Sequence, residues 1–199
     1  MSRLSAVQLL VLDHDGVLTD NHVYVNERGE ESCRYYRGDG LGIERVKKLS
    51  VRVMVISGER NGVVAARCAK LRINCLSGVE DKLHALRQEA HFEALPLEYI
   101  AYIGNDINDL ECLKAVGHPF VPRQTSERVV WDEAQRRGWP DVSPGGDGCV
   151  REVCDLIADA IEGKASGSRC AVCNGPAQTR HCPGTNVDWT CDHCGTAIC

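Results

Sequence analysis

Carboxylates, hydroxyls and glycines are concentrated in three short segments, each of which follows a run of apolar residues. The segments are Asp13–Asp20 (DHDGVLTD), Ser57–Arg60 (SGER) and Gly104–Asp109 (GNDIND). Paired carboxylates such as Asp13 and Asp15 suit nucleophilic attack by one group and proton transfer by the other. They also suit a hard cation such as Mg²⁺, which prefers oxygen ligands.

Other polar residues extend this chemistry toward a phosphoryl group. Asp106 and Asp109 would add negative charge, and so many carboxylates together are unfavourable without a cation. Ser57 can donate a hydrogen bond to a phosphoryl oxygen, and Lys82 can neutralise its charge. A single aspartate at the end of a strand is more often a helix cap or turn former. Three such segments together favour catalysis.

The elements that must position these segments can be read from the apolar pattern. Residues 8–12, 53–56 and 99–103 form short apolar runs that predict buried strands, and amphipathic helical spacing lies between them. This alternation predicts an α/β fold with a Rossmann-like parallel sheet covered by helices on both faces. Residues 22–36 break the rhythm and predict a β-hairpin insertion that turns near Gly29. Ligands bind at the carboxyl ends of such strands, so we expect the three polar segments to share one rim.

The polar segments, together with Lys82, resemble the four motifs of phosphatases of the haloacid dehalogenase superfamily. Three further segments resemble the small capless branch that dephosphorylates 3-deoxy-manno-octulosonate 8-phosphate and related sialic acid 9-phosphates. They are Arg37–Ile43 (RGDGLGI), Asp81–Leu83 (DKL) and Gly145–Val153 (GGDGCVREV). The resemblance covers about residues 7–162.

The resemblance implies a Mg²⁺-dependent phosphatase of a sugar-acid phosphate. Asp13 would attack phosphorus and form an aspartyl-phosphate. Asp15 would protonate the leaving sugar oxygen and then activate the water that hydrolyses the intermediate. Ser57 and Lys82 would hold the transferring phosphoryl group, so that positioning and electrostatics carry most of the catalysis.

The resemblance also implies where Mg²⁺ would bind. Its ligands would be the carboxylate of Asp13, the backbone carbonyl of Asp15 and a residue of the loop after the third strand, where the candidates are Asn105, Asp106 and Asp109. Active relatives usually have aspartate at the position of Asn105. An amide oxygen can bind Mg²⁺ but carries no negative charge. Asn105 is therefore expected to weaken the affinity for Mg²⁺ or to abolish activity.

Two further features concern His14 and the substrate. His14 stands where the family usually has an apolar residue, and we expect a buried, hydrogen-bonded histidine. Gly58 and Glu59 follow Ser57, and a glutamate here is more typical of the nine-carbon 9-phosphatases than of the eight-carbon enzymes. Arg67 and Lys70 are candidates to meet the substrate carboxylate. The alternative is that these two residues form a solvated helix face.

Residues 164–199 hold six of the twelve cysteines. Two C-x-x-C pairs, Cys170/Cys173 and Cys191/Cys194, are separated by 17 residues and predict a four-thiolate zinc ribbon that stabilises a segment poor in hydrophobic residues. Disulfides are the alternative, which a reducing compartment disfavours. Four further residues remain unassigned: Cys182, Cys199, His181 and His193. We therefore predict a phosphatase domain at 1–163, a linker at 164–169 and a zinc ribbon at 170–199.

Charge and hydropathy limit the partners. The net charge is −5, and residues 164–199 hold only three basic and two acidic residues, so nucleic-acid binding has no electrostatic support. No apolar run reaches the ~18 residues of a membrane span, and no secretory signal is recognisable, which predicts a cytoplasmic protein. Docking of a protein partner or added oligomer contacts are the expected roles of the ribbon.

Oligomeric state follows from the absence of an insertion long enough to form a cap domain. In the branch that the chain resembles, a neighbouring subunit closes the site and the hairpins meet at the centre, which implies a homotetramer. Two alternatives to catalysis remain. One is a non-catalytic oligomerisation module like the domain attached to sialic-acid nucleotide synthetases, and the other is a ribbon-led binding protein with an inactive body.

Overall fold

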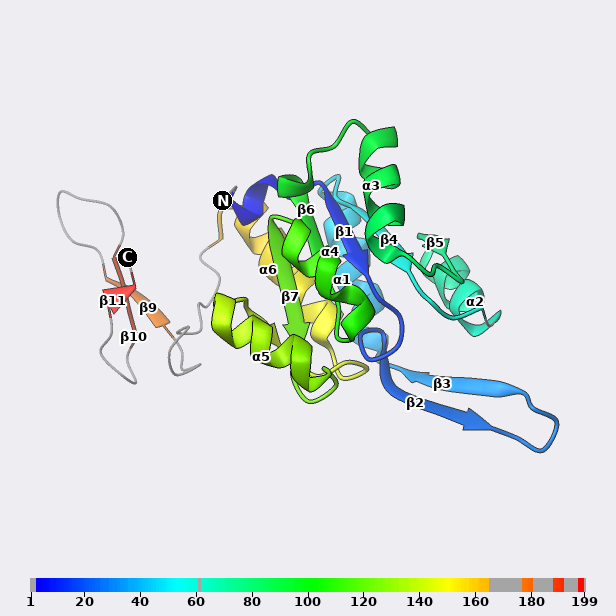
Figure 1. The fold of residues 1–199 in the computed structure, drawn as a ribbon. Helices are drawn as coiled ribbons and strands as arrows, with labels where there is room; N and C mark the ends of the chain where they lie inside the picture. Colours follow the sequence, from blue (N-terminus) through cyan, green and yellow to red (C-terminus); the bar gives the residue numbers. More distant parts are fainter. Residues whose placement is uncertain (1–2, 61, 165–176, 181–187, 192–196, 199) are drawn as a thin grey trace. The chain divides into compact units, whose positions relative to one another are not determined.

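The computed structural model describes residues 3–60, 62–164, 177–180, 188–191 and 197–198. The chain divides into two compact units, residues 1–161 and 162–199. The first unit contains a six-stranded sheet in the order β5-β4-β1-β6-β7-β8, whose neighbouring strands are all parallel (Figure 1). The strands are β1 (Leu9–Leu12), β4 (Arg52–Ile56), β5 (Asn74–Leu76), β6 (Ile100–Ile103), β7 (His118–Pro122) and β8 (Asp141–Val142). The predicted α/β parallel sheet is confirmed.

Helices cover both faces of this sheet, and the strand β1 shows why. All four residues of β1 are buried; Leu10 and Leu12 pack into one hydrophobic cluster, whereas Leu9 and Val11 pack into the other. The first cluster takes its helical residues from α1 (Arg37–Lys48), α2 (Gly62–Leu71) and α6 (Cys149–Ile161). The second takes them from α3 (Lys82–Phe92), α4 (Leu110–Ala115) and α5 (Arg128–Arg137). Three short 3₁₀ turns complete the unit at Leu4–Ala6, Leu97–Tyr99 and Ile107–Asp109.

The predicted hairpin is confirmed and projects beyond the carboxyl ends of the strands (Figure 1). It consists of β2 (Thr19–Val25) and β3 (Glu31–Tyr35), so it begins three residues before the predicted range. Its turn uses Gly29, whose φ of +75° is accessible to glycine without strain. The outer part of β2 leaves Val23, Tyr24 and Val25 between 52% and 59% exposed.

The second unit contains a three-stranded antiparallel sheet in the order β11-β10-β9. The strands are β9 (Ala177–Arg180), β10 (Asp188–Cys191) and β11 (Ala197–Ile198). Of the predicted zinc ligands, Cys191 ends strand β10, whereas Cys170, Cys173 and Cys194 lie outside the described residues. The unassigned residues Cys182, Cys199, His181 and His193 also lie outside the described residues. The zinc site and the linker boundaries therefore stay predictions.

Within the described ranges, no helix is long and apolar enough to cross a membrane.

Candidate active site

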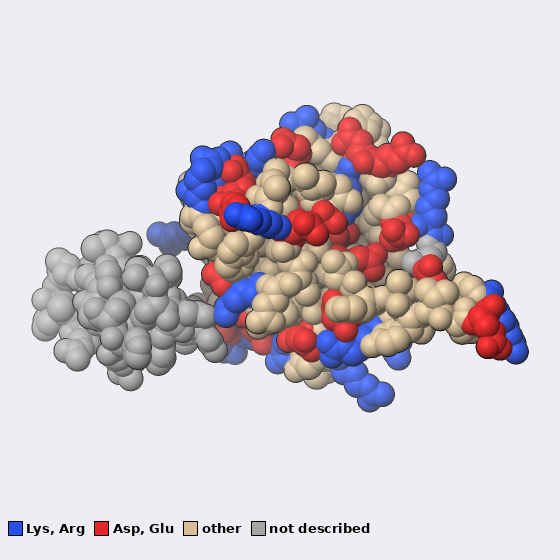
Figure 2. Space-filling model, turned by 60° about the horizontal axis from the view of Figure 1, so that its bottom comes forward, with Lys and Arg blue, Asp and Glu red and all other residues tan. Residues whose placement is uncertain are grey.

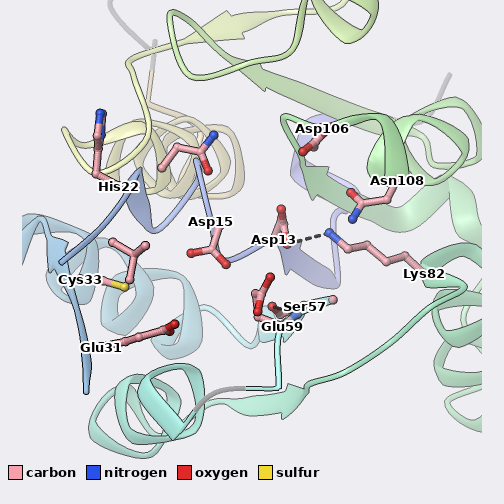
Figure 3. A pocket seen from close by; sticks show the side chains of 13 residues that line it. Asp13, Asp15, His22, Glu31, Cys33, Ser57, Glu59, Lys82, Asp106 and Asn108 are labelled. Atoms are coloured by element: carbon pink, nitrogen blue, oxygen red, sulfur yellow. Dashed lines mark hydrogen bonds and ion pairs between the residues drawn. The ribbon is translucent and has the colours of Figure 1, made fainter. Parts of the chain in front are cut away.

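The three polar segments meet at the carboxyl ends of three neighbouring strands. Asp13 follows β1 and donates its backbone N–H to the Ile103 carbonyl at 2.9 Å, which ties the first segment to the end of β6, directly before the third. Ser57 follows β4, and Lys82 begins helix α3. They surround an open cavity of about 300 Å³ (Figure 3). Its lining residues are Asp13, Asp15, Asn21, His22, Val23, Glu31, Cys33, Ser57, Gly58, Glu59, Lys82, Asp106 and Asn108.

Lys82 forms buried ion pairs with two carboxylates at this cavity. Its ammonium lies 2.7 Å from Asp13 Oδ1 and 2.8 Å from Asp109 Oδ1, and the residue is only 2% exposed. Burial lowers the pKa of Lys82, but the two carboxylates raise it further, so the ammonium keeps its proton. Burial and the neighbouring Asp109 raise the pKa of Asp13 well above its usual range, although Lys82 opposes this shift. A bound cation would act in the same direction as Lys82 and lower this pKa.

Asp109 has a supporting position beneath the cavity. One carboxylate oxygen accepts hydrogen bonds from Lys82 and from the buried Tyr102 hydroxyl, at 2.8 and 2.7 Å. The other accepts the backbone N–H groups of Asn105 and Asp106. Asp109 is fully buried and does not line the cavity. The carboxylate of Asp109 therefore holds Lys82 and the loop in place, and its role as a metal ligand stays a prediction.

The side-chain amide of Asn105 lies beside residues 13–20, called the nucleophile loop below, and its oxygen lacks a hydrogen-bond partner among the described residues. Its Nδ2 donates to the Thr125 carbonyl at 3.0 Å, whereas its buried Oδ1 has no hydrogen-bond partner in the described structure. The amide packs so closely on Gly16 (φ +78°) that a Cβ there would lie 2.1 Å from Nδ2. A buried acceptor without a donor is costly unless a ligand satisfies it. Together with the carboxylates of Asp13 and Asp106, this donor set fits a hard divalent cation.

Asp15 occupies the cavity wall between Asp13 and the hairpin (Figure 3). Its side chain is 36% exposed, so solvent and a substrate can reach it. Asp15 Oδ1 lies 3.0 Å from His14 Nδ1, and the other ring nitrogen of His14 lies 2.8 Å from the Tyr35 hydroxyl. His14 itself is completely buried, as expected from the sequence.

The segment after β4 supplies neutral and acidic groups to the cavity. Ser57 Oγ accepts the Glu59 backbone N–H at 3.1 Å, so its O–H can donate to a ligand oxygen. Gly58 and Glu59 also line the cavity, where we predicted them to contact the substrate.

Arg67 and Lys70 are not among the residues that line this cavity, and their contact with the substrate carboxylate stays a prediction. The guanidinium of Arg67 lies over the Tyr35 ring, 4.6 Å from its centroid, and donates to the Tyr36 carbonyl. Lys70 is exposed on α2 and absent from the lining residues. The periodicity of α2 placed both residues on its polar side, but it carried no information on the distance to the rim.

The hairpin contributes a wall that sequence reasoning did not assign to the site. His22 comes from β2, and Glu31 and Cys33 come from β3 (Figure 3). Residues 31, 33 and 35 share one face of β3 because side chains alternate along a strand. The first two reach the cavity and Tyr35 reaches His14. This alternation, directly after the nucleophile loop, was the signal that could have found them.

Comparison with known proteins gives the class. KdsC of Escherichia coli (strain B / BL21-DE3), a 3-deoxy-D-manno-octulosonate 8-phosphate phosphatase, is 33% identical over 158 residues, which cover 79% of this chain and 82% of KdsC. The crystal structure of the phosphatase of that name from Yersinia pestis matches with a TM-score of 0.75 and 31% identity over 80% of this chain and 85% of that one. The Moraxella catarrhalis enzyme, in complex with magnesium, phosphate and KDO, matches with a TM-score of 0.70 and 30% identity over 80% and 90% of the two chains. No protein-family model matches the chain.

The fold, the polar residues at the carboxyl ends of the strands and the sequence similarity together show that the chain is a phosphatase of the haloacid dehalogenase superfamily. Such an enzyme is a phosphoric monoester hydrolase. Within that superfamily, the chain belongs to the 3-deoxy-D-manno-octulosonate 8-phosphate phosphatase family.

Proposed function

We propose that this protein hydrolyses the phosphomonoester of an eight- or nine-carbon sugar acid with Asp13 as the nucleophile and Mg²⁺ as the cofactor. The observation that carries the proposal is the convergence of Asp13, Asp15, Ser57 and Lys82 on one solvent-accessible cavity. Family membership supports the sugar-acid class of substrate. The intact set of four also argues against the non-catalytic alternatives.

Each group of the chain has a defined task in this mechanism. Asp13 attacks phosphorus and takes the phosphoryl group as an aspartyl-phosphate, while Asp15 gives a proton to the departing sugar oxygen. Asp15 then removes a proton from the water that attacks the aspartyl-phosphate, which releases phosphate and restores Asp13. Lys82 and the Ser57 hydroxyl hold the phosphoryl oxygens throughout. The fixed ammonium and hydroxyl need little reorganisation during transfer.

The residues that would hold Mg²⁺ are Asp13, the Asp15 backbone carbonyl, Asp106 and the free Oδ1 of Asn105. Bound there, the cation would supply positive charge against the phosphoryl oxygens and keep the Asp13 carboxylate ionised. Asn105 contributes no negative charge, so we expect a weaker affinity for Mg²⁺ than an aspartate at this position would give. Asn105→Asp should therefore lower the Mg²⁺ concentration needed for half-maximal turnover.

The body is proposed to assemble as a homotetramer through its hairpins. Figure 2 shows the hairpin as a projecting arm whose charged groups gather at the tip while uncharged side chains cover most of its length. Val23, Tyr24 and Val25 are exposed on that arm. An exposed apolar strand of this kind is typical of an interaction surface. A neighbouring subunit would then cover the cavity, which a single chain leaves open.

The tail is proposed to bind one structural zinc ion through Cys170, Cys173, Cys191 and Cys194. The spacing of the two C-x-x-C pairs supports this proposal. A ribbon of this kind would serve to dock a protein partner or to extend the oligomer. Cytoplasmic location also stays a prediction.

The proposal is tested by a phosphate-release screen over sugar-acid and hexose phosphates, with Mg²⁺ and with a chelator. Turnover should require Mg²⁺, should favour the sugar-acid phosphates and should disappear in Asp13→Asn. Asp132→Asn, at an aspartate that is 65% exposed on α5, is the matched control and should retain full activity. Substantial activity in purified Asp13→Asn would contradict the nucleophile assignment.

A further inference from the structure

His14 connects the acid–base candidate to the hairpin. It is completely buried, and both of its ring nitrogens have partners: Asp15 Oδ1 at 3.0 Å and the Tyr35 hydroxyl at 2.8 Å. An apolar residue, which the family usually has here, would fill similar space but make neither contact. The two contacts join neighbouring residues of the nucleophile loop to a residue of strand β3.

The direction of these hydrogen bonds follows from the chemistry of the partners. Nδ1 of His14 faces Asp15 Oδ1, a carboxylate oxygen that accepts hydrogen bonds, so the tautomer with a hydrogen on Nδ1 lets the ring donate to Asp15. Nε2 is then an acceptor and receives the Tyr35 hydroxyl. Burial raises the pKa of Tyr35, so the phenol keeps its proton and can donate. Both ring nitrogens of His14 therefore have a hydrogen-bond partner.

Packing holds this chain of groups in place. The rings of His14 and Tyr35 meet edge to face, with centroids 5.7 Å apart, and Arg67 lies over the Tyr35 ring. On the other side, Asp15 has one further contact, from the Thr19 hydroxyl, at the long distance of 3.5 Å. Both contacts use Oδ1 of Asp15, which leaves Oδ2 for the cavity.

We propose that His14 is a positioning residue that holds Asp15 with Oδ2 toward the reacting oxygen, and that Tyr35 fixes His14 from the hairpin. This inference rests on the proposed acid–base role of Asp15. It makes the hairpin strand β3 part of the catalytic support, because a shift of Tyr35 would release the ring that orients Asp15. An acid or base works only within hydrogen-bond reach of its target, so orientation sets its contribution.

The test uses side chains that keep one of the two contacts at a time. His14→Val removes both contacts and restores the apolar character usual in the family. His14→Asn keeps a donor near the place of Nδ1, whereas His14→Gln keeps a polar group near Nε2. Tyr35→Phe removes only the hydroxyl, and Tyr36→Phe on the adjacent residue is the matched control. Thermal unfolding of each variant verifies that it folds.

The readout is kcat/KM for a sugar-acid phosphate, whose leaving alkoxide needs a proton, and for p-nitrophenyl phosphate, whose leaving group does not. His14→Val should lower kcat/KM by about tenfold for the sugar-acid phosphate and by much less for the aryl phosphate. His14→Asn should recover most of the loss, and His14→Gln should not. Tyr35→Phe should change the ratio in the same direction by a smaller factor, while Tyr36→Phe should leave it unchanged.

Equal losses for both substrates, or no difference between the Asn and Val variants, would show that His14 only supports the structure and would overturn the proposal. Should His14→Val fail to fold, His14→Asn and Tyr35→Phe decide by the same ratio. Asp15→Asn distinguishes the positioning role of His14 from the acid–base role of Asp15. If Asp15→Asn changes the substrate ratio but the His14 variants do not, the positioning role fails alone. If Asp15→Asn leaves the ratio unchanged, the acid–base role of Asp15 fails as well.

Discussion

Replacing Lys82 by methionine tests the electrostatic design of the site. The substitution keeps most of the length of the side chain and its apolar stem, but it removes the ammonium that lies between Asp13 and Asp109. Both carboxylates are buried, with exposures of 5% and 0%. They would then face each other without a compensating cation, and the phosphoryl group would lose its fixed positive charge.

The expected loss of stability follows from the cost of leaving buried charges unpaired. Removing one partner from a buried ion pair costs about 3–5 kcal/mol, which for a chain of this size lowers Tm by about 10 °C. The loss should depend on pH, because Lys82 is the group that lowers the pKa of Asp13 against the effects of burial and Asp109. A carboxyl whose pKa is raised on folding binds more protons in the folded state than in the unfolded state, so stability falls as pH rises. The variant should therefore lose more stability at pH 8 than at pH 5.

Thermal unfolding of the purified full chain at pH 5 and pH 8 measures this effect, and phosphate release measures the loss of turnover. Lys48→Met, at an exposed lysine of α1, is the matched control and should change neither. Adding Asp109→Asn to Lys82→Met should restore part of the stability at pH 8 without restoring activity. A Lys82→Met protein that melts like the wild type at pH 8, or that loses the same amount of stability at both pH values, would show that Lys82 does not compensate the buried carboxylates.

Three further predictions concern other parts of the chain. Burial raises the pKa of Asp39 to about 7. Its contribution to stability is therefore largest below about pH 4 and is lost as pH rises to about 7. Asp39→Asn should make Tm less dependent on pH between these two values. Tyr24→Asp on the hairpin should convert the proposed tetramer into smaller species in sedimentation, and an unchanged assembly would argue against hairpin contacts. Reduced, purified protein should contain about one zinc per chain by elemental analysis, and Cys170→Ser with Cys191→Ser should remove it; zinc retained in that double variant would contradict the ribbon.

The central part of the fold could be predicted because its strands are buried on both faces. β1, β4 and β6 read as continuous apolar runs for that reason. Strand β7, between β6 and the edge strand β8, contains two prolines, and β8 has only two residues, so neither produces a recognisable strand pattern. Helix α5 buries only Val130 and Ala134 between polar residues, which is too weak a period to identify it.

The site could be predicted where position in the chain determines position in space. The ends of adjacent parallel strands lie together, so Asp13, Ser57 and the loop after β6 were expected to meet, and they do. Distances across elements could not be read in this way. Two of the four hydrogen bonds that occupy Asp109 come from Tyr102 and Lys82, whose convergence needs the packed structure. The arrangement of Arg67 on Tyr35 depends on the path of the hairpin over α2.

A phosphoryl group on Asp13 during turnover would be direct evidence for covalent catalysis, and it can be sought by isotope labelling. The full chain is mixed with ³²P-labelled 3-deoxy-manno-octulosonate 8-phosphate and Mg²⁺, quenched with acid within milliseconds, and the precipitated protein is counted and mapped by peptide. Covalent catalysis by Asp13 predicts label on the peptide that contains Asp13, released by hydroxylamine, and no label in Asp13→Asn. Phosphate release that proceeds in Asp13→Asn, or label that persists in that variant, would contradict it.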